Sequence, residues 1–300
     1  MTMAWLNLSY GEAVALLCAV IWASNSLVLK TLTHKIPAAL ITAIRCGFSG
    51  LMFWGLMIWG PPLSTLALVP LREWGLLIGS VTIGIVIGDL FYLHAMKEIG
   101  VSRAMALVGT FPITTLIFQQ LLLDYPVTRT FVLASCLAAA GVICLSGQAP
   151  QDNGDGEKPV RLKRGAFLAL MAALFWGLST VMLKPAIANL TSVQANSVRM
   201  PLVALALTGI WRLNRRSDDL KEMNLRLFGL VALTGILGMG IGSYLYLESV
   251  EHIGPAKTAT ISAATPVITL ILAIIFLKEK ITLRLLLGVA LCVSGVLLVL

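Results

Sequence analysis

The sequence predicts an all-α integral membrane protein whose ten transmembrane helices form two inverted five-helix repeats. The 300-residue chain is 58% hydrophobic and 12% charged, with a mean hydropathy of +0.92. No soluble core of this size could bury so much apolar surface. The chain also repeats itself at a constant offset of 154 residues, which indicates one membrane unit written twice. The matched positions are Gly84, Gly88, Tyr92, Gly100 and Pro112 with Gly238, Gly242, Tyr246, Gly254 and Pro266.

Ten apolar runs are long enough to cross the hydrocarbon layer, which takes about 20 helical residues. In chain order they cover residues 12–30, 37–59, 74–95, 101–123, 128–147, 165–184, 191–212, 225–247, 254–276 and 281–300. The connections between them are short and contain Gly, Pro or charged residues. The exception is a polar linker at 148–164, rich in turn formers, which separates a first repeat at 11–147 from a second at 165–300.

The repeat extends over nearly the whole chain. Its matched pairs include Trp22 with Trp176, Lys30 with Lys184, Arg45 with Arg199, Gly55 with Gly209 and Gly141 with Gly295. Chance similarity between apolar stretches could supply leucines, but it would not place Trp, Lys, Arg and several Gly in one frame. Each repeat has an odd number of spans, so the second must enter the membrane from the opposite side. Inverted repeats of this kind are typical of secondary transporters, which bind substrate near the midplane.

The basic residues are unevenly divided between the two sides of the membrane. Of the 22 Lys and Arg, Arg45 and Arg199 lie within spans and 16 lie in the loops on one side. The other side carries Arg72, Arg129, Lys184 and Lys257. Cytoplasmic loops are enriched in Lys and Arg, so the richer side is expected to be cytoplasmic and both termini are expected to lie on the opposite side. The expected location of the protein is the cell (inner) membrane. The net charge of +8 therefore does not indicate nucleic-acid binding, since no continuous basic face is available.

Several motifs, present twice, resemble the EamA domain of the drug/metabolite transporter superfamily. They are a Trp-containing helix ending in Lys (IWASNSLVLK, 21–30; FWGLSTVMLK, 175–184), an Arg early in the next helix, a turn before a Pro-containing helix (96–112; 250–266), and the closing LKEKITLRLLLGVALCVSGV (277–296). The first repeat departs from the closing motif, because it reads LLLDYPVTR at 121–129. The resemblance implies a ten-helix transporter of small metabolites, often an exporter. It also implies cytoplasmic termini, against the charge count.

Two arginines inside spans are the strongest candidates for substrate contact. Arg45 and Arg199 each lie about eight residues into a span, roughly 12 Å deep at 1.5 Å per residue. An unpaired arginine there costs at least about 2.5–3.5 kcal/mol, so each should face the bundle interior. Asp89 lies at a similar depth to Arg45 and could form an ion pair with it, or be protonated during transport. The second repeat has Ser243 at the equivalent position, which leaves Arg199 as the better candidate for an anionic substrate group.

Other polar and aromatic residues could line the same cavity. They are Trp22, Asn25 and Tyr92 in the first repeat and Trp176 and Tyr244 in the second. Each has an alternative role in helix packing or in hydrogen bonds between helices. The Gly84/Gly88 and Gly238/Gly242 pairs indicate close helix packing.

Pro112 and Pro266 each remove a backbone hydrogen bond in mid-span. They would kink the fourth span of each repeat, either to allow gating or only to shape the bundle.

The sequence therefore predicts a secondary-active transporter of small metabolites, such as amino acids or other organic anions, that works by alternating access. The predicted direction of transport is export. No nucleotide-binding motif, metal-ligand cluster or catalytic arrangement is evident, so we expect no enzyme activity, no cofactor and no metal. The alternatives are a lipid-carrier flippase of the same superfamily and a membrane-embedded enzyme. The expected partners are a small-molecule substrate and the lipid bilayer, without nucleic acid, for a monomer or homodimer.

Overall fold

The computed structural model describes residues 8–32, 35–60, 63–99, 104, 107–123, 125, 127–146, 162–214, 220–221, 223–265, 267–269, 271–272 and 283–300. These residues form helices and connecting turns, and no strand occurs among them. The first half contains α1 (Tyr10–Leu32), α2 (Ala38–Met57), η1 (Leu63–Leu68), α3 (Leu71–Val81), η2 (Thr82–Gly88), α4 (Asp89–Ile99), α6 (Phe111–Leu123) and α7 (Arg129–Ser146). The second half contains α8 (Leu162–Ala186), α9 (Ser192–Leu213), α10 (Leu225–Thr234), η3 (Gly235–Gly242), α11 (Ser243–Ile253), α12 (Pro255–Ser262) and α14 (Leu283–Leu297).

The helices confirm an all-helical membrane protein. Among the described residues, four helices are both long and apolar enough to cross a bilayer: Ala38–Met57, Leu71–Ala95, Lys163–Ala186 and Leu225–Ile253. Three further apolar helices are shorter. The ends of α1, α2, α7, α8, α9 and α14 lie within about three residues of the predicted spans. Most of the predicted linker, 147–161, lies outside the described residues.

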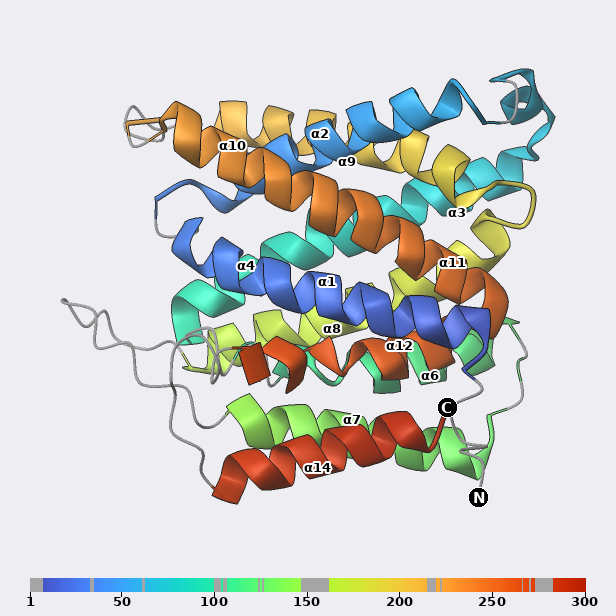
Figure 1. The fold of residues 1–300 in the computed structure, drawn as a ribbon, viewed down its shortest axis with the longest axis vertical. Coiled ribbons are helices and arrows are strands. Elements are labelled where there is room, and N and C mark those ends of the chain that lie inside the picture. Colours follow the sequence, from blue (N-terminus) through green and yellow to red (C-terminus); the bar gives the residue numbers. More distant parts are fainter. Residues whose placement is uncertain are drawn as a thin grey trace.

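The helices are stacked with their axes running in similar directions (Figure 1). Helices α2 and α9 pack together at one end of the stack, and α7 and α14 pack together at the other. Between these pairs, α1 lies against η3, α11 and α12, and α8 lies against η2, α3, α4 and α6. The first-half helices α1, α2 and α7 therefore have their main neighbours in the second half.

The crossing of α7 and α14 depends on two glycines at equivalent repeat positions. A Cβ on Gly141 would lie 2.5 Å from the backbone nitrogen of Cys292. A Cβ on Gly295 would lie 2.5 Å from the carbonyl oxygen of Ala134. Backbone atoms cannot move aside as a side-chain end can, so only glycine allows the two helices to approach this closely.

The sequence indicated a continuous helix for the third span of each repeat. The structure instead has a π-helical segment within this span. These segments, η2 and η3, occupy equivalent repeat positions and have the glycine-rich sequences TIGIVIG and GILGMGIG. The wider π turn offsets the backbone hydrogen bonds and leaves carbonyl groups for other partners. In η3, the Gly238 oxygen accepts from Trp22 Nε1 at 3.0 Å and the Gly242 oxygen from Cys18 Sγ at 3.2 Å.

The predicted proline kink in the fourth span is wrong for the first repeat. Gly109 and Thr110 form a turn, and α6 begins directly after it, so Pro112 is the second residue of a new helix. A proline costs little there, because the first N–H groups of a helix have no partner within it. Pro266 lies outside the described residues. The equivalent turn is nonetheless present at Ala263 and Ala264, after the end of α12.

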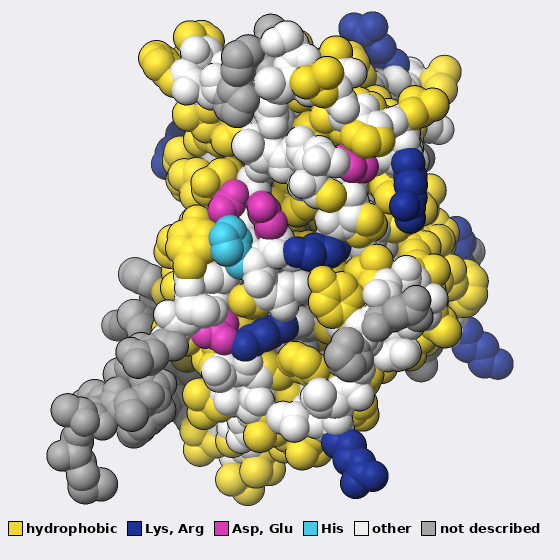
Figure 2. Space-filling view, turned by 90° about the vertical axis from the view of Figure 1, so that its right-hand side faces the viewer, with side chains coloured by type: hydrophobic (Ala, Val, Ile, Leu, Met, Phe, Trp, Pro, Cys, Tyr) yellow, Lys and Arg dark blue, Asp and Glu magenta, His cyan; other side chains and the backbone are white. Residues whose placement is uncertain are grey.

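Apolar side chains make up much of the surface of the bundle, and the face shown in Figure 2 also carries charge. Figure 2 shows lysine, arginine, acidic and histidine side chains distributed along this face, bordered by hydrophobic ones. Large apolar residues are widely exposed, such as Leu51 in α2, Leu205 in α9 and Leu225 in α10, which are 60%, 73% and 86% exposed. Such a surface fits lipid rather than water.

Candidate functional site

Two arginines lie buried in the neighbouring helices α2 and α9. Arg45 is 7% exposed and Arg199 is 4% exposed. The Nε atom of each guanidinium is buried and finds no hydrogen-bond partner in the described part of the chain. A buried donor left without a partner costs about 1–3 kcal/mol, and more for a charged group. Both arginines therefore retain a donor inside the bundle that a small ligand or water could satisfy.

Arg45 meets both α1 and the π-helix η3. Its Nη2 atom lies 2.9 Å from the place where a Cβ on Gly238 would stand, and the side-chain carbon Cγ of Asn25 lies 3.1 Å from the same point. Asn25 is 5% exposed and donates its amide to the carbonyl of Ile21, but its Oδ1 has no partner among the described residues. A guanidinium and an unpaired amide oxygen thus lie side by side, in space that Gly238 leaves open.

Arg199 is held by a residue that sequence reasoning missed. Its Nη1 donates to Oδ1 of Asn196 at 2.9 Å, and the same oxygen accepts from Ser243 Oγ at 3.0 Å. Asn196 is fully buried, and its Nδ2 has no partner in the described residues. The available signal was an amide one helical turn before a buried arginine, which places both on one face of α9. The result is a cluster with two unpaired donors, Asn196 Nδ2 and Arg199 Nε.

The hypothetical ion pair between Arg45 and Asp89 is not formed. Asp89 starts α4 and is partly exposed, and its Oδ1 accepts from Trp176 Nε1 of α8 at 3.0 Å. No ion pair within 4.0 Å joins Asp89 to Arg45, although both are described. The two charges still lie within electrostatic range of each other. The sequence predicted similar depths for the two residues, but it could not predict which helix faces they occupy. The Asp89 carboxylate instead accepts a hydrogen bond from the indole of Trp176 in the other half.

The two mid-span tryptophans occupy corresponding positions in the two halves. Trp22 of α1 donates to Gly238 of η3, and Trp176 of α8 donates to Asp89 directly after η2. Each ring also lies beside a tyrosine, with centroids 5.2 Å apart for Trp22 and Tyr246 and 5.4 Å apart for Trp176 and Tyr92. These contacts are the packing role that the sequence allowed for the tryptophans. Both indoles remain partly exposed.

The tyrosine whose ring lies beside Trp22 is Tyr246. Tyr246 is 8% exposed, and its hydroxyl shares a hydrogen bond of 2.9 Å with Thr180 of α8. Tyr244 instead lies near Tyr10, the first residue of α1, whose hydroxyl donates to Glu248 at 3.2 Å. Tyr246 is the repeat equivalent of Tyr92, and that correspondence was the signal for choosing it.

Apart from Tyr244 and the prolines, the candidate residues lie near one another. The Cys46 thiol of α2 lies within electrostatic range of Arg45, Asp89 and Arg199. Asn25 and Trp22 adjoin Arg45 through η3, while Trp176 and Tyr92 adjoin Asp89. Among the residues that the structure describes, no group of three or more His, Cys, Asp or Glu side chains could hold a metal ion.

The sequence of each half matches a known family model. The model of the EamA-like transporter family matches residues 9–147 and again residues 163–300. The chain belongs to this family. It is consequently a multi-pass membrane transporter of the drug/metabolite transporter superfamily.

Two comparisons agree with this EamA assignment. A protein of Archaeoglobus fulgidus described as an uncharacterized transporter is 23% identical over 287 residues, which cover 96% of each chain. A protein of known crystal structure is 19% identical, and it superposes with a TM-score of 0.80 over 96% of this chain and 95% of its own. At this identity, the likeness to the solved structure concerns the fold alone.

Proposed function

We propose that this EamA-family chain is a secondary-active exporter of small organic anions, amino acids included, and that it works by alternating access. The observation that carries the proposal is the cluster of Arg199 and Asn196, two buried side chains that each keep an unpaired donor. A guanidinium beside an amide donor is suited to a carboxylate, which accepts two parallel hydrogen bonds. A substrate carboxylate would satisfy donors that the protein itself leaves open.

The proposed architecture is ten transmembrane helices in two inverted five-helix repeats, 11–147 and 165–300. It is supported by features that recur at the repeat offset, namely the π-helices η2 and η3 and the turns that interrupt the fourth spans. Interrupted helices near the midplane are characteristic of transporters that move one repeat against the other. Because α1 packs on η3 and α8 on η2, such a motion would open and close the region between the arginines.

The difference between the halves favours an anionic substrate bound near the second-half arginine. Asp89 in the first half corresponds to Ser243 in the second, and Ser243 hydrogen bonds to Asn196. The positive charge of Arg199 therefore lacks the neighbouring carboxylate that Arg45 has within electrostatic range. The proposed orientation follows the charge count, with the 16-residue basic side in the cytoplasm and both termini outside.

A counterflow assay in liposomes tests the binding site. The purified chain would be screened against labelled organic anions and amino acids, with an uncharged sugar as the reference solute. We expect Arg199→Ala to reduce uptake of the transported anion about 100-fold, because the bidentate contact and the charge are both lost.

Arg164→Ala is the matched control, because Arg164 lies at the start of α8 and its side chain is 57% exposed in an ion pair with Glu98. Undiminished uptake by Arg199→Ala would exclude the proposed site. Transport of the sugar alone would exclude the anionic substrate class.

Asp89 supplies the gradient coupling in this proposal. It is an interior carboxyl whose only hydrogen bond in the described residues comes from a neutral indole, so it is free to exchange a proton during transport. Asp89→Asn keeps an acceptor for Trp176 and removes the titration. We expect the wild-type rate to increase about tenfold under an imposed proton gradient and the variant rate to stay constant. An equal response of both proteins would remove Asp89 from the coupling step.

A further inference from the structure

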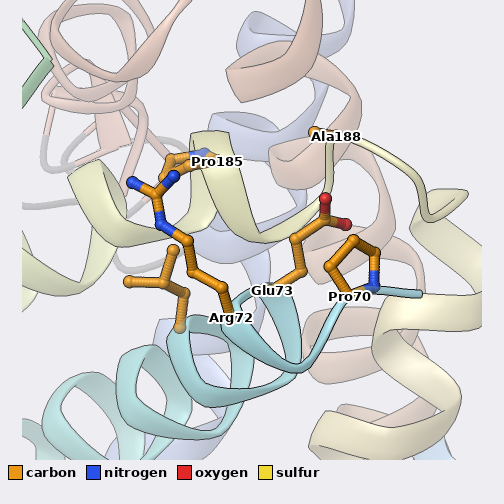
Figure 3. A pocket seen from close by; sticks show the side chains of 6 residues that line it. Pro70, Arg72, Glu73, Pro185 and Ala188 are labelled. Carbon is orange, nitrogen blue, oxygen red and sulfur yellow. The ribbon is translucent and has the colours of Figure 1, made fainter.

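A hollow of about 280 Å³ lies where the first turn of α3 meets the end of α8, away from the central arginines. Its lining residues are Pro70, Arg72, Glu73, Leu76, Pro185 and Ala188. Figure 3 shows the Arg72 guanidinium extending beside Pro185, while the Glu73 carboxylate extends toward Ala188. The hollow thus carries a positive group and a negative group on an otherwise apolar wall.

Glu73 is fixed in place, whereas Arg72 is free to bind. Glu73 is 9% exposed, and its Oε1 and Oε2 accept from the side-chain Nδ2 and the backbone nitrogen of Asn189 at 2.6 Å and 3.3 Å. These donors are neutral, and they leave further lone pairs of the Glu73 carboxylate open. Arg72 is exposed and forms no hydrogen bond or ion pair with a described residue.

The surroundings place this hollow at the level of the lipid headgroups. It lies at the first turn of one membrane-spanning helix and the last turn of another. The connection from α2 to α3 carries the strongly exposed apolar residues Ile58, Trp59, Leu68 and Leu71, at 76%, 83%, 82% and 87%. Apolar and aromatic residues at the end of a span are typical of the membrane–water interface, where they enter the headgroup region.

We propose that this hollow, which we term the α3–α8 pocket, binds the headgroup of a zwitterionic phospholipid. The Arg72 guanidinium accommodates the phosphate through paired N–H···O contacts, and the Glu73 carboxylate receives the ammonium group. The apolar wall of Pro70, Leu76 and Pro185 packs against the glycerol end, and the acyl chains continue along the exposed apolar surface. An anionic headgroup without an ammonium group would meet the uncompensated charge of Glu73.

The second half has no carboxylate at the position equivalent to Glu73, which provides an internal control. The repeat equivalents of Arg72 and Glu73 are Arg226 and Leu227 at the start of α10. Arg226 is also exposed, but no carboxylate follows it, and Asn224 caps the helix by accepting from the Leu227 nitrogen at 2.8 Å. An arginine of the same exposure and helix position is therefore present without the negative partner.

Lipid titration of the purified full-length chain in detergent, read by native mass spectrometry, tests the proposal. The probes are dioctanoyl phosphatidylethanolamine, dioctanoyl phosphatidylglycerol and water-soluble glycerophosphoethanolamine. We expect the ethanolamine lipid to bind about tenfold more tightly than the glycerol lipid. Arg72→Ala should reduce this affinity about tenfold, and Arg226→Ala should leave it unchanged.

Glu73→Gln keeps an acceptor for Asn189 and should remove the preference between the two lipids without loss of folded protein. Three results would overturn the proposal. The first is equal binding of the two lipids by the wild type, and the second is unchanged binding of the ethanolamine lipid by Arg72→Ala. The third is an affinity for glycerophosphoethanolamine equal to that for the ethanolamine lipid, which would indicate a site for soluble zwitterions.

Discussion

The two repeats make equivalent contacts at the crossing of α7 with α14 but different contacts at the centre of the bundle. At the crossing the halves are equivalent, because Gly141 and Gly295 each contact the backbone of the partner helix. At the centre they differ, because Trp22 donates to a backbone carbonyl whereas its equivalent Trp176 donates to the carboxylate of Asp89. Duplication alone explains the first region. The second shows where the halves have diverged, and the divergence coincides with the buried charges.

The largest effect is expected where the halves are equivalent. Gly141→Ala and Gly295→Ala should each lower the free energy of unfolding by about 3 kcal/mol, because a Cβ would collide with backbone atoms at 2.5 Å. Gly55→Ala and Gly209→Ala are the controls, since a Cβ at either position meets nothing within 4 Å. Thermal unfolding in detergent measures the difference. Clearly unequal losses at Gly141 and Gly295 would break the equivalence.

A smaller effect should separate the two tryptophans. Trp176→Phe removes a hydrogen bond to a charged acceptor and should cost about 2 kcal/mol, whereas Trp22→Phe removes one to a neutral carbonyl and should cost about 1 kcal/mol. Both variants lose the same part of the indole ring, so the difference between their costs reports on the hydrogen-bond acceptor. When Asp89→Asn is already present, adding Trp176→Phe should cost only as much as Trp22→Phe does in the wild type. If Asp89→Asn leaves the difference intact, the charge of Asp89 is not its cause.

The smallest effect concerns two ion pairs near the helix ends. Glu12 and Lys257 join α1 to α12 with side chains 7% and 20% exposed, whereas Glu98 and Arg164 join α4 to α8 with side chains 23% and 57% exposed. Solvent screens the second pair more strongly, so Glu98→Gln should cost at most about 0.5 kcal/mol and Glu12→Gln about 1 kcal/mol. Raising the salt concentration should reduce the cost of Glu98→Gln further. A larger cost for Glu98→Gln than for Glu12→Gln would contradict the expectation that the more exposed ion pair contributes less to stability.

Much of the fold follows from the sequence, because apolar run length and the repeat report directly on spanning helices. The ends of α1, α2 and α9 were predicted closely, and the glycine pairs at Gly84 and Gly238 do permit close packing. The π-helices were not predicted, since a run of Gly, Ile and Val has no apolar periodicity that distinguishes a π from an α turn.

The sequence named most residues of the candidate site but not their pairing. The positions of Arg45 and Asp89 along their spans suggested an ion pair, but the hydrogen-bond partner of Asp89 comes from the other half, at Trp176. Asn196 was missed because an amide among apolar residues has no motif, and only its contacts with Arg199 and Ser243 reveal it. The α3–α8 pocket also joins separate segments, since Arg72 and Pro185 are more than a hundred residues apart.

The interlocking of the two halves has a consequence for biosynthesis. The indole of Trp22 finds its acceptor 216 residues later in the chain, which corresponds to a wait of roughly 10–40 s at 5–20 residues per second of translation. During that interval α1 lies in the bilayer without its main neighbours η3, α11 and α12. Nascent chains halted at the inter-repeat linker should therefore be held by membrane chaperones and degraded when these are removed, whereas completed chains should be released.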